Sequence, residues 1–429
     1  MRRMETLVVG LDLGTSKTVC VIGGWDNNAF RVLGLGSAPS EGVRSGVIVN
    51  LKAAMKGVLK AIQEAEGGVY KVKNLIVGVA GGSVEGINSR GVVAVSAQAE
   101  IGQQDVDRVI DAAKAVVIPT DREIMHVMPQ EFLVDAARRI KDPVGMMGIR
   151  LEAEVHIITS SQAVSRNLVQ GLGAAGYGVS EVVLDTLASA RTVLHGEEKD
   201  VGVLVIDLGA GTSDVVLYFD GAPHFSKVYS LGSDRITKDI AQVLQIPDDE
   251  AEHLKLRYGH TWLPGLTQDG EVIVREVGSR PAFTLLKSQL AQIIQARTQE
   301  IFELIFKDVQ KTGLLEQLGA GLVLTGGGSH LEGVTELAGQ VFGKPARMGL
   351  PTRIPGVGEA WQRPEYTAAV GLVLWGQDKQ PPQRVQDTRS PEPKGAEPGE
   401  PPPAHRTAAA PPGESLGARV WRFIKQNFI

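Results

Sequence analysis

Two short motifs, far apart in the chain, repeat one pattern of residues that is suited to binding a phosphate. Residues 8–17 read VVGLDLGTSK and residues 204–214 read LVIDLGAGTSD. Each is an apolar run, an aspartate and a turn of glycine and hydroxyl residues, and a second apolar run follows. This pattern predicts a β-hairpin with a small polar tip. Backbone N–H groups at such a tip form an anion-binding concavity, and glycines let the backbone approach a ligand, so two facing tips would hold a polyphosphate.

An aspartate ends the first strand of each hairpin, Asp12 in one and Asp207 in the other. Mg²⁺ in proteins keeps several of its waters and takes only one or two carboxylates. The pair is therefore predicted to hold a hydrated magnesium ion beside the phosphates. One such hairpin alone would be interpreted equally well as an ordinary tight turn, and it is the repetition that indicates a site.

A third glycine motif follows the apolar run of residues 322–325. Gly326, Gly327 and Gly328 would let an adenine and its ribose lie flat against the backbone. Alone, such a triplet is more often a tight turn, and its position after the two hairpins is what favours a nucleotide site. Neither a P-loop nor a Gly-x-Gly-x-x-Gly motif that opens a helix competes with it in the sequence.

Length, charge and cysteine content exclude several other classes of protein. The 429 residues suffice for two or more hydrophobic cores. The net charge of −5 argues against a nucleic-acid partner, because such proteins carry a basic surface. Cys20 is the only cysteine, so it cannot form an internal disulfide and is predicted to be buried. The histidines do not show zinc-ligand spacing, and the sequence has neither a secretory signal nor an apolar run of about 18 residues, which predicts a cytoplasmic protein.

The pattern along the chain is that of an α/β protein with an inserted unit and a change of composition near the C-terminus. Residues 84–161 are interpreted as a small self-contained α/β unit. An apolar stripe at helical spacing predicts the longest helix over 283–313, after a strand pair around 271–276. Ten of the 22 prolines fall within 380–414, a composition that predicts a disordered linker over 379–415.

The last fourteen residues, 416–429, form an amphipathic pattern. Bulky apolar side chains on one helical face and cations on the other are typical of a helix that lies in a membrane interface. The alternative is a helix that packs on the protein's own core or in a partner's groove. One copy would bind weakly, so attachment should depend on self-association. The apolar face comprises Leu416, Val420, Trp421, Phe423, Ile424 and Phe428, and the cations are Arg419, Arg422 and Lys425.

The order of these elements resembles the actin/Hsp70/sugar-kinase superfamily, whose two phosphate motifs and adenosine motif match the three motifs above. Within it, the chain is similar to the FtsA family for three further reasons. The unit at 84–161 occupies the place of that family's distinctive subdomain, and residues 366–372 (YTAAVGL) are similar to its closing segment. A linker that ends in a basic amphipathic helix is the family's membrane-targeting arrangement. The resemblance covers residues 6–377 and the C-terminal tip.

The resemblance implies roles for individual residues. Asp12 and Asp207 would organise Mg²⁺ through water, and Lys17 would neutralise phosphate charge unless it is a solvated hairpin lysine. The residues that would contact the phosphates are Gly14, Thr15, Ser16, Gly209, Gly211 and Thr212. Those that would border the adenosine are Gly326, Gly327 and Gly328.

Two positions depart from the superfamily pattern. Ala210 stands where a glycine is common, which is tolerable only if its φ is negative. Asp185 stands where relatives that hydrolyse ATP place Glu or Gln to orient the attacking water, and it is one methylene shorter than Glu. It is therefore a candidate for positioning water in a slow hydrolysis. Asp214 is expected to fix the turn rather than to touch the ligand.

The resemblance implies an α/β, actin-like two-lobed ATPase fold with an inserted α/β subdomain, a disordered C-terminal linker and a terminal amphipathic helix. The expected divisions are 1–83, 162–199 and 355–378 for lobe 1 (subdomain 1A), 84–161 for the insert (1C), 200–234 and 300–354 for lobe 2 (2A), 235–299 for subdomain 2B, 379–415 for the linker and 416–429 for the membrane helix.

The function that the resemblance implies is that of an ATP-binding, actin-like cell-division protein. It would polymerise beneath the cytoplasmic membrane at the septum, anchor the FtsZ ring there and recruit later division proteins. The expected partners are FtsZ, other copies of the chain, anionic lipid and those later proteins. Two alternatives remain open: a pilus-assembly adaptor of the same fold, and a small-molecule kinase of the superfamily.

Overall fold

The structure is a computed structural model. It describes residues 7–26, 29–81, 84–96, 100–275, 281–351 and 354–379. The predicted membrane helix, and the predicted linker apart from Lys379, lie outside these residues. Among the residues described, none of the helices combines the length and the apolar character needed to cross a bilayer.

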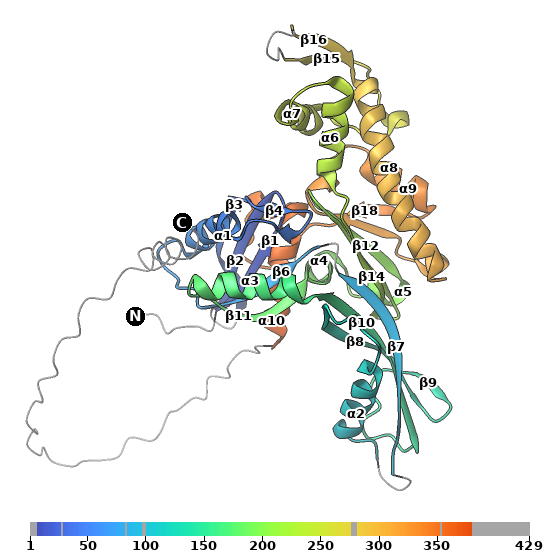
Figure 1. Cartoon of the computed structure of the whole chain (residues 1–429). Coiled ribbons are helices and arrows are strands. Elements are labelled where there is room, and N and C mark those ends of the chain that lie inside the picture. Colours follow the sequence, from blue (N-terminus) through green and yellow to red (C-terminus); the bar gives the residue numbers. More distant parts are fainter. Residues whose placement is uncertain are drawn as a thin grey trace, which may run out of the picture.

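The first phosphate motif lies at the centre of a five-stranded sheet (Figure 1). The strands β1 and β2 form the predicted antiparallel hairpin, β6 pairs parallel to β1, and β11 pairs parallel to β6. The order across the sheet is β11-β6-β1-β2-β3. The bounds are β1 Val8–Leu13, β2 Lys17–Asp26, β3 Ala29–Pro39, β6 Asn74–Val79 and β11 Gly178–Leu184.

The second motif lies in a nine-stranded sheet, five strands of which have the same topology as the first sheet. Here β12 and β13 form the hairpin, β17 pairs parallel to β12, and β18 pairs parallel to β17. The segment β18-β17-β12-β13-β14 therefore repeats the first sheet strand for strand. The bounds are β12 Val203–Leu208, β13 Ser213–Phe219, β14 Ala222–Tyr229, β17 Leu322–Thr325 and β18 Ala346–Met348.

Two helices lie between the sheets. Small residues let these helices, α4 (Asp185–Val193) and α10 (Thr367–Lys379), pack closely, since a Cβ at Gly371 would overlap the backbone of Ala188. The side chain of Val370 packs with the first sheet, and that of Leu187 packs with the second. The helices α1 (Leu51–Glu66) and α3 (Gln162–Ala174) cover the outer face of the first sheet.

The outer face of the second sheet is covered by α6, α7, α8 and α9, whose apolar side chains form one core with it. The prediction of one helix over 283–313 is wrong at its start, because residues 283–286 pair with 271–274 as a strand. The helix α8 runs without a break past residue 299, where a subdomain boundary was predicted. The bounds are α6 Ser233–Leu244, α7 Asp248–Tyr258, β15 Glu271–Val274, β16 Phe283–Leu286, α8 Lys287–Lys311 and α9 Val334–Phe342.

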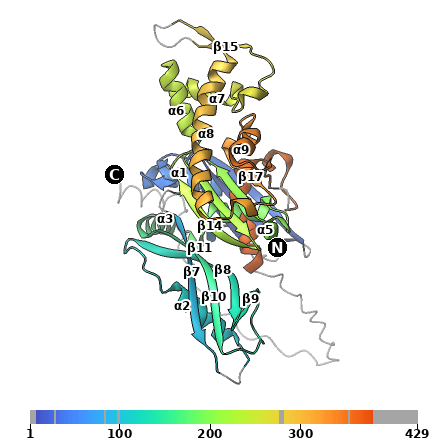
Figure 2. The same ribbon diagram turned by 90° about the vertical axis from the view of Figure 1, so that its right-hand side faces the viewer.

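The inserted unit, predicted over 84–161, has a hydrophobic core of its own between α2 and its strands. Its strands continue the second sheet, because β7 pairs with β14 where Glu85 stands opposite Lys227. Figure 2 shows this unit extending from the sheet on the side opposite α6 and α7. The bounds are β7 Glu85–Ala94, α2 Gln103–Lys114, β8 Arg122–Val134, β9 Ala137–Ile140 and β10 Arg150–Ser161.

Short elements complete the described chain. Two of these, the 3-10 turns η3 and η5, border the site described next. The bounds are β4 Val43–Arg44, β5 Val47–Ile48, α5 Glu198–Val201, η1 Leu263–Gly265, η2 Leu315–Gln317, η3 Gly327–His330, η4 Glu359–Trp361 and η5 Pro364–Tyr366.

Candidate functional site

The three sequence motifs meet at one cavity of about 670 Å³. Strands β1, β12 and β17 end at this cavity, and the polar turns that follow these strands line it. Every residue predicted from the motifs lines it. They are Asp12, Gly14, Thr15, Ser16, Lys17, Asp185, Asp207, Gly209, Gly211, Thr212, Gly326, Gly327 and Gly328.

The two hairpin tips touch one another. A Cβ at Gly211 would overlap Thr15 Oγ1 and would lie 2.8 Å from the Cα of Ser45. Thr15 Oγ1 also accepts a hydrogen bond of 3.1 Å from the backbone N–H of Gly46, a cavity residue that the sequence did not single out. The glycine at 211 is therefore required for close approach.

The glycines of the two tips do not need a left-handed backbone. None of the tip residues 14, 209 and 211 has a positive φ, and a Cβ at Gly14 would instead lie 2.8 Å from the carbonyl oxygen of Lys17. Ala210 is likewise absent from the described residues with positive φ, which meets the condition under which alanine can replace glycine there. The residues of the tips are small because larger side chains would collide with the neighbouring backbone and with the opposite tip.

Four carboxyl groups gather around the cavity, and the half-buried pair, Asp12 and Asp207, are the predicted magnesium ligands. Burial and the charge of Asp207 raise the pKa of Asp12 to about 7, although Lys17 opposes this rise. Burial raises the pKa of Asp207 to about 6, and a hydrogen bond from Ser189 Oγ to Asp207 Oδ2, 3.0 Å long, opposes it. Ser189 is a residue that sequence reasoning missed.

The other two carboxyl groups belong to Asp185 and Asp214. Burial, followed by the charge of neighbouring aspartates, raises the pKa of both well above the ordinary value. The Oδ1 atom of each is buried and has no hydrogen-bond partner among the described residues. Asp214, which is expected to fix the turn rather than to touch the ligand, also lines the cavity. Gly78 is required beside Asp185, since a Cβ there would overlap the carboxylate.

This set of side chains fits a magnesium ion bound to a polyphosphate. Buried carboxylates with raised pKa values and unpaired oxygens are stabilised by a nearby cation. Within the described ranges there is no group of three or more Asp, Glu, His or Cys side chains that could form a complete protein cage for a metal ion. Such a site suits Mg²⁺, which takes few carboxylates and shares its remaining positions between water and phosphate.

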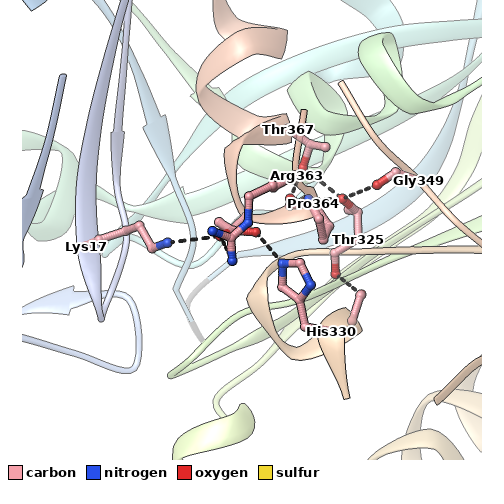
Figure 3. A network of polar contacts seen from close by, with 9 residues as sticks. Lys17, Thr325, His330, Gly349, Arg363, Pro364 and Thr367 are labelled. Carbon is pink, nitrogen blue, oxygen red and sulfur yellow. Dashed lines mark hydrogen bonds and ion pairs between the residues drawn. The ribbon is translucent and has the colours of Figure 1, made fainter. Parts of the chain in front are cut away.

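The glycine triplet forms another wall of the cavity. Gly326 has a φ of +79°, and a Cβ there would lie 2.7 Å from the carbonyl oxygen of Leu208, so this turn needs glycine. Its N–H donates a 3.1 Å hydrogen bond to the carbonyl oxygen of Pro364. The hydroxyls of Thr325 and Thr367, 2.9 Å apart, tie the same turn to the start of α10 (Figure 3).

Several charged residues of the cavity lie outside the three motifs, namely His330, just after the glycine triplet, and Lys255, Arg363 and Glu365 in other segments. Lys17 Nζ lies 3.5 Å from Glu365 Oε1, and His330 and Arg363 also contact Glu365. The side chain of Lys255 is only 3% exposed, and its Nζ lies 2.7 Å from Glu252 Oε2. No single-sequence signal marks these residues, although Glu365 directly precedes the segment 366–372.

Comparison with known families gives two matches along the chain. The profile of the family described as "SHS2 domain inserted in FTSA" matches residues 81–159. The profile of "Cell division protein FtsA" matches residues 204–371.

Relatives that are named "Cell division protein FtsA" match over most of their length. The protein of Borreliella burgdorferi is 46% identical over 381 residues, which are 88% of this chain and 92% of the relative. That of Pseudomonas aeruginosa is 37% identical over 377 residues, which are 87% of this chain and 90% of the relative.

Solved structures with lower identity share the fold. A PilM–PilN type IV pilus biogenesis complex aligns with a TM-score of 0.63 at 18% identity, over 87% of this chain and 99% of that one. MreB5 of Spiroplasma citri bound to ADP aligns with a TM-score of 0.54 at 13% identity, over 87% and 97%. A MamK double helical filament aligns with a TM-score of 0.52 at 12% identity, over 88% and 99%.

The pilus-assembly alternative is supported only by this likeness of fold, whereas the FtsA relatives match at 37–46% identity over most of both chains. The two profile matches include the inserted unit. The chain therefore belongs to the FtsA family of actin-like cell-division proteins.

Proposed function

We propose that the chain binds ATP and Mg²⁺ in this cavity and assembles into filaments that tether the division ring to the cytoplasmic membrane. The observation that carries the proposal is the contact between the two hairpin tips, which brings Asp12 and Asp207 to one cavity in a member of the FtsA family. The ADP-bound MreB5, which shares the fold, supports a nucleotide as the ligand.

The residues divide into three groups by the part of the nucleotide that they would contact. Backbone N–H groups and hydroxyls of the two tips face the phosphates, and Lys17 supplies positive charge. Asp12 and Asp207 would hold the magnesium ion through water, and that ion would neutralise the phosphates between the two carboxylates. The glycines 326–328 leave a flat backbone wall for the adenosine.

Hydrolysis is proposed to be slow. Asp185 lies at the first residue of α4 and faces the cavity with a buried, unpartnered oxygen. Its short side chain would place a water less well than Glu would, and burial raises its pKa, which favours the neutral carboxyl group, a poorer acceptor. This suits a protein whose assembly is regulated by nucleotide.

Assembly and membrane attachment are proposed from the family and from the sequence. A MamK filament shares the fold, which supports self-association of this chain. The amphipathic pattern of residues 416–429 supports a reversible anchor to anionic lipid at the septum. FtsZ is the proposed ring partner, and the insert is proposed to contribute to self-association and to recruit later division proteins.

Calorimetric titration of the purified full chain with ATP tests the nucleotide proposal directly. With Mg²⁺ present, we expect saturable heat from a single site, and much weaker binding after chelation of the metal. The variant D207N should lose most of this metal dependence. The absence of any ATP-dependent heat for the unaltered chain would contradict the proposal, and rapid phosphate release that depends on a small-molecule acceptor would support a kinase instead.

A further inference from the structure

One buried carboxylate of the cavity, that of Glu365, has no role in the function proposed above. Three side chains converge on it, and its own side chain is 7% exposed. Lys17 Nζ and Arg363 Nη2 lie 3.5 Å and 3.0 Å from Oε1, and His330 Nε2 lies 2.6 Å from Oε2. Glu365 is therefore the carboxylate that Lys17, Arg363 and His330 share.

These contacts join the two halves of the site. Lys17 is the first residue of β2, in the hairpin of the first sheet, whereas His330 ends η3, directly after β17 of the second sheet. Figure 3 shows Lys17 and His330 reaching toward the position of Arg363 from opposite sides. Glu365, in η5, thus links the first phosphate motif to the adenosine motif.

Lys17 is held in a way that permits exchange. Its side chain is 34% exposed, its distance to Glu365 is the longest of the three, and its Nζ lies 4.9 Å from the centre of the Tyr366 ring. Burial would raise the pKa of Glu365, but the hydrogen bond from His330 and the charge of Lys17 outweigh it, so the pKa lies below its ordinary value. Glu365 is therefore an anion at neutral pH.

We propose that Glu365 is a positioning residue that competes with the phosphates of a nucleoside polyphosphate for Lys17. The inference rests on the proposed function, in which Lys17 neutralises phosphate charge. The Lys17 amine cannot pair fully with a phosphate while it is paired with the Glu365 carboxylate. It must move away from the carboxylate before it can neutralise the phosphate. Arg363 and His330 remain on Glu365, so this carboxylate keeps a counter-ion when Lys17 moves. The result is a site that binds polyphosphates less tightly than its cations alone would allow.

The test is calorimetric titration of the full chain and of the variant E365Q with ATP·Mg²⁺ and, separately, with adenosine. Removing a competing charge at a partly buried ion pair should tighten ATP binding by about threefold to tenfold. Adenosine affinity should not change, because it lacks the phosphates for which Glu365 competes. A merely structural role of Glu365 would weaken both ligands together.

A double-mutant cycle with Lys17 gives the decisive control. In the K17M background, the further change E365Q should no longer tighten ATP binding. The matched variant R363A removes a cation but leaves the carboxylate. It should weaken ATP binding, since Glu365 then holds Lys17 more firmly. Equal effects of E365Q with and without Lys17 would overturn the proposal.

The outcomes separate this inference from the proposed function. ATP binding by the unaltered chain, together with unchanged or weaker binding by E365Q, overturns the inference alone. The absence of ATP binding by the unaltered chain overturns both. Circular dichroism and thermal unfolding check that E365Q folds. Should it not, E365D keeps the charge but withdraws it from Lys17 by one methylene, and it should tighten ATP binding by a smaller factor while leaving adenosine unaffected.

Discussion

Gly211 lies directly against Thr15, so the second hairpin tip contacts the first across the cavity. No side chain larger than hydrogen fits at position 211 without displacing Thr15 or the backbone at Ser45. The spacing of the two tips, and with it the separation of Asp12 from Asp207, therefore depends on this one glycine.

The variant G211A should bind ATP·Mg²⁺ about fivefold to 150-fold more weakly, because an added methyl group in a packed contact costs about 1–3 kcal/mol. Calorimetric titration measures the affinity. G173A is the matched control, since a Cβ at Gly173 in α3 would meet nothing within 4 Å. Unchanged ATP affinity in G211A would show that the tips do not close around the phosphates.

Ser189 should control the magnesium dependence of nucleotide binding. Its hydroxyl donates to Asp207 Oδ2 at 3.0 Å, and a hydrogen bond to a charged group contributes about 1.5–3 kcal/mol. In S189A we expect the Mg²⁺ concentration for half-maximal ATP binding to rise by about tenfold. T192V should leave it unchanged, since the Thr192 hydroxyl, in the same helix, donates to the Ser189 carbonyl oxygen and has no other hydrogen bond within the described part of the chain. Equal behaviour of the two variants would argue against the role of Ser189.

Asp185 should affect hydrolysis more than binding. In D185N, phosphate release in a single turnover should slow by at least about tenfold, because an amide cannot accept a proton from water. ATP affinity should stay the same or rise, since one of four crowded carboxylates is removed. G78A should act in the same direction by displacing Asp185. If D185N hydrolyses ATP at the unaltered rate, Asp214 becomes the better candidate, and D214N is the variant to compare.

His156 should make the junction of the insert with the second sheet sensitive to acid. Its ring nitrogens bond Asn88 at 2.6 Å and Ser226 at 2.8 Å, and burial, aided by the charge of His224, lowers its pKa from 6.5 to about 4. Unfolding therefore takes up a proton between these pH values, so the free energy of unfolding is highest above about pH 6.5 and falls as the pH falls toward 4.

Chemical denaturation of H156Q and of the unaltered chain at several pH values between 4 and 7 tests this. The variant should lose less stability over that range. His126, whose pKa burial also lowers to about 4, accounts for part of the remaining slope, and the double variant H126Q/H156Q should be flatter still. A slope in H156Q as steep as in the unaltered chain would show that His156 does not take up the proton.

The C-terminal segment should attach the protein to membranes. Co-sedimentation with anionic liposomes in the presence of ATP compares the full chain with one truncated at Pro411. We expect binding only by the full chain, and the double variant W421E/F423E should behave like the truncation, because it puts charge on the apolar face. The charge-preserving variant R419K is the matched control and should bind like the full chain. Equal sedimentation of full and truncated chains would refute the anchor.

The sequence predicted those parts of the fold whose signals are local. Both hairpins and the strand Leu322–Thr325 follow from short apolar runs that end in polar turns. The apolar residues of the strand Phe283–Leu286 merge with the stripe of α8, so the local pattern predicts a helix there. The strand forms because it pairs with Glu271–Val274, a contact that the local pattern does not reveal.

The part of the candidate site that comes from the three local motifs was also predictable from the sequence. Its motif residues do meet at one cavity, as the repeated pattern indicated. Gly78, Ser189 and Glu365 were not predictable, because their importance arises from contacts with Asp185, Asp207 and Lys17 that only the folded chain creates.

The pairing of Glu85 with Lys227 attaches the insert to the second sheet, which its place in the chain does not suggest. In sequence it interrupts the half of the molecule that carries β1, yet a backbone pair and three side-chain hydrogen bonds, from Asn88, Gln130 and His156, tie it to β14 in the half that carries β12. Any rotation of one half against the other should therefore carry the insert along with β14, so that a small change at the cavity becomes a larger swing at its distant end.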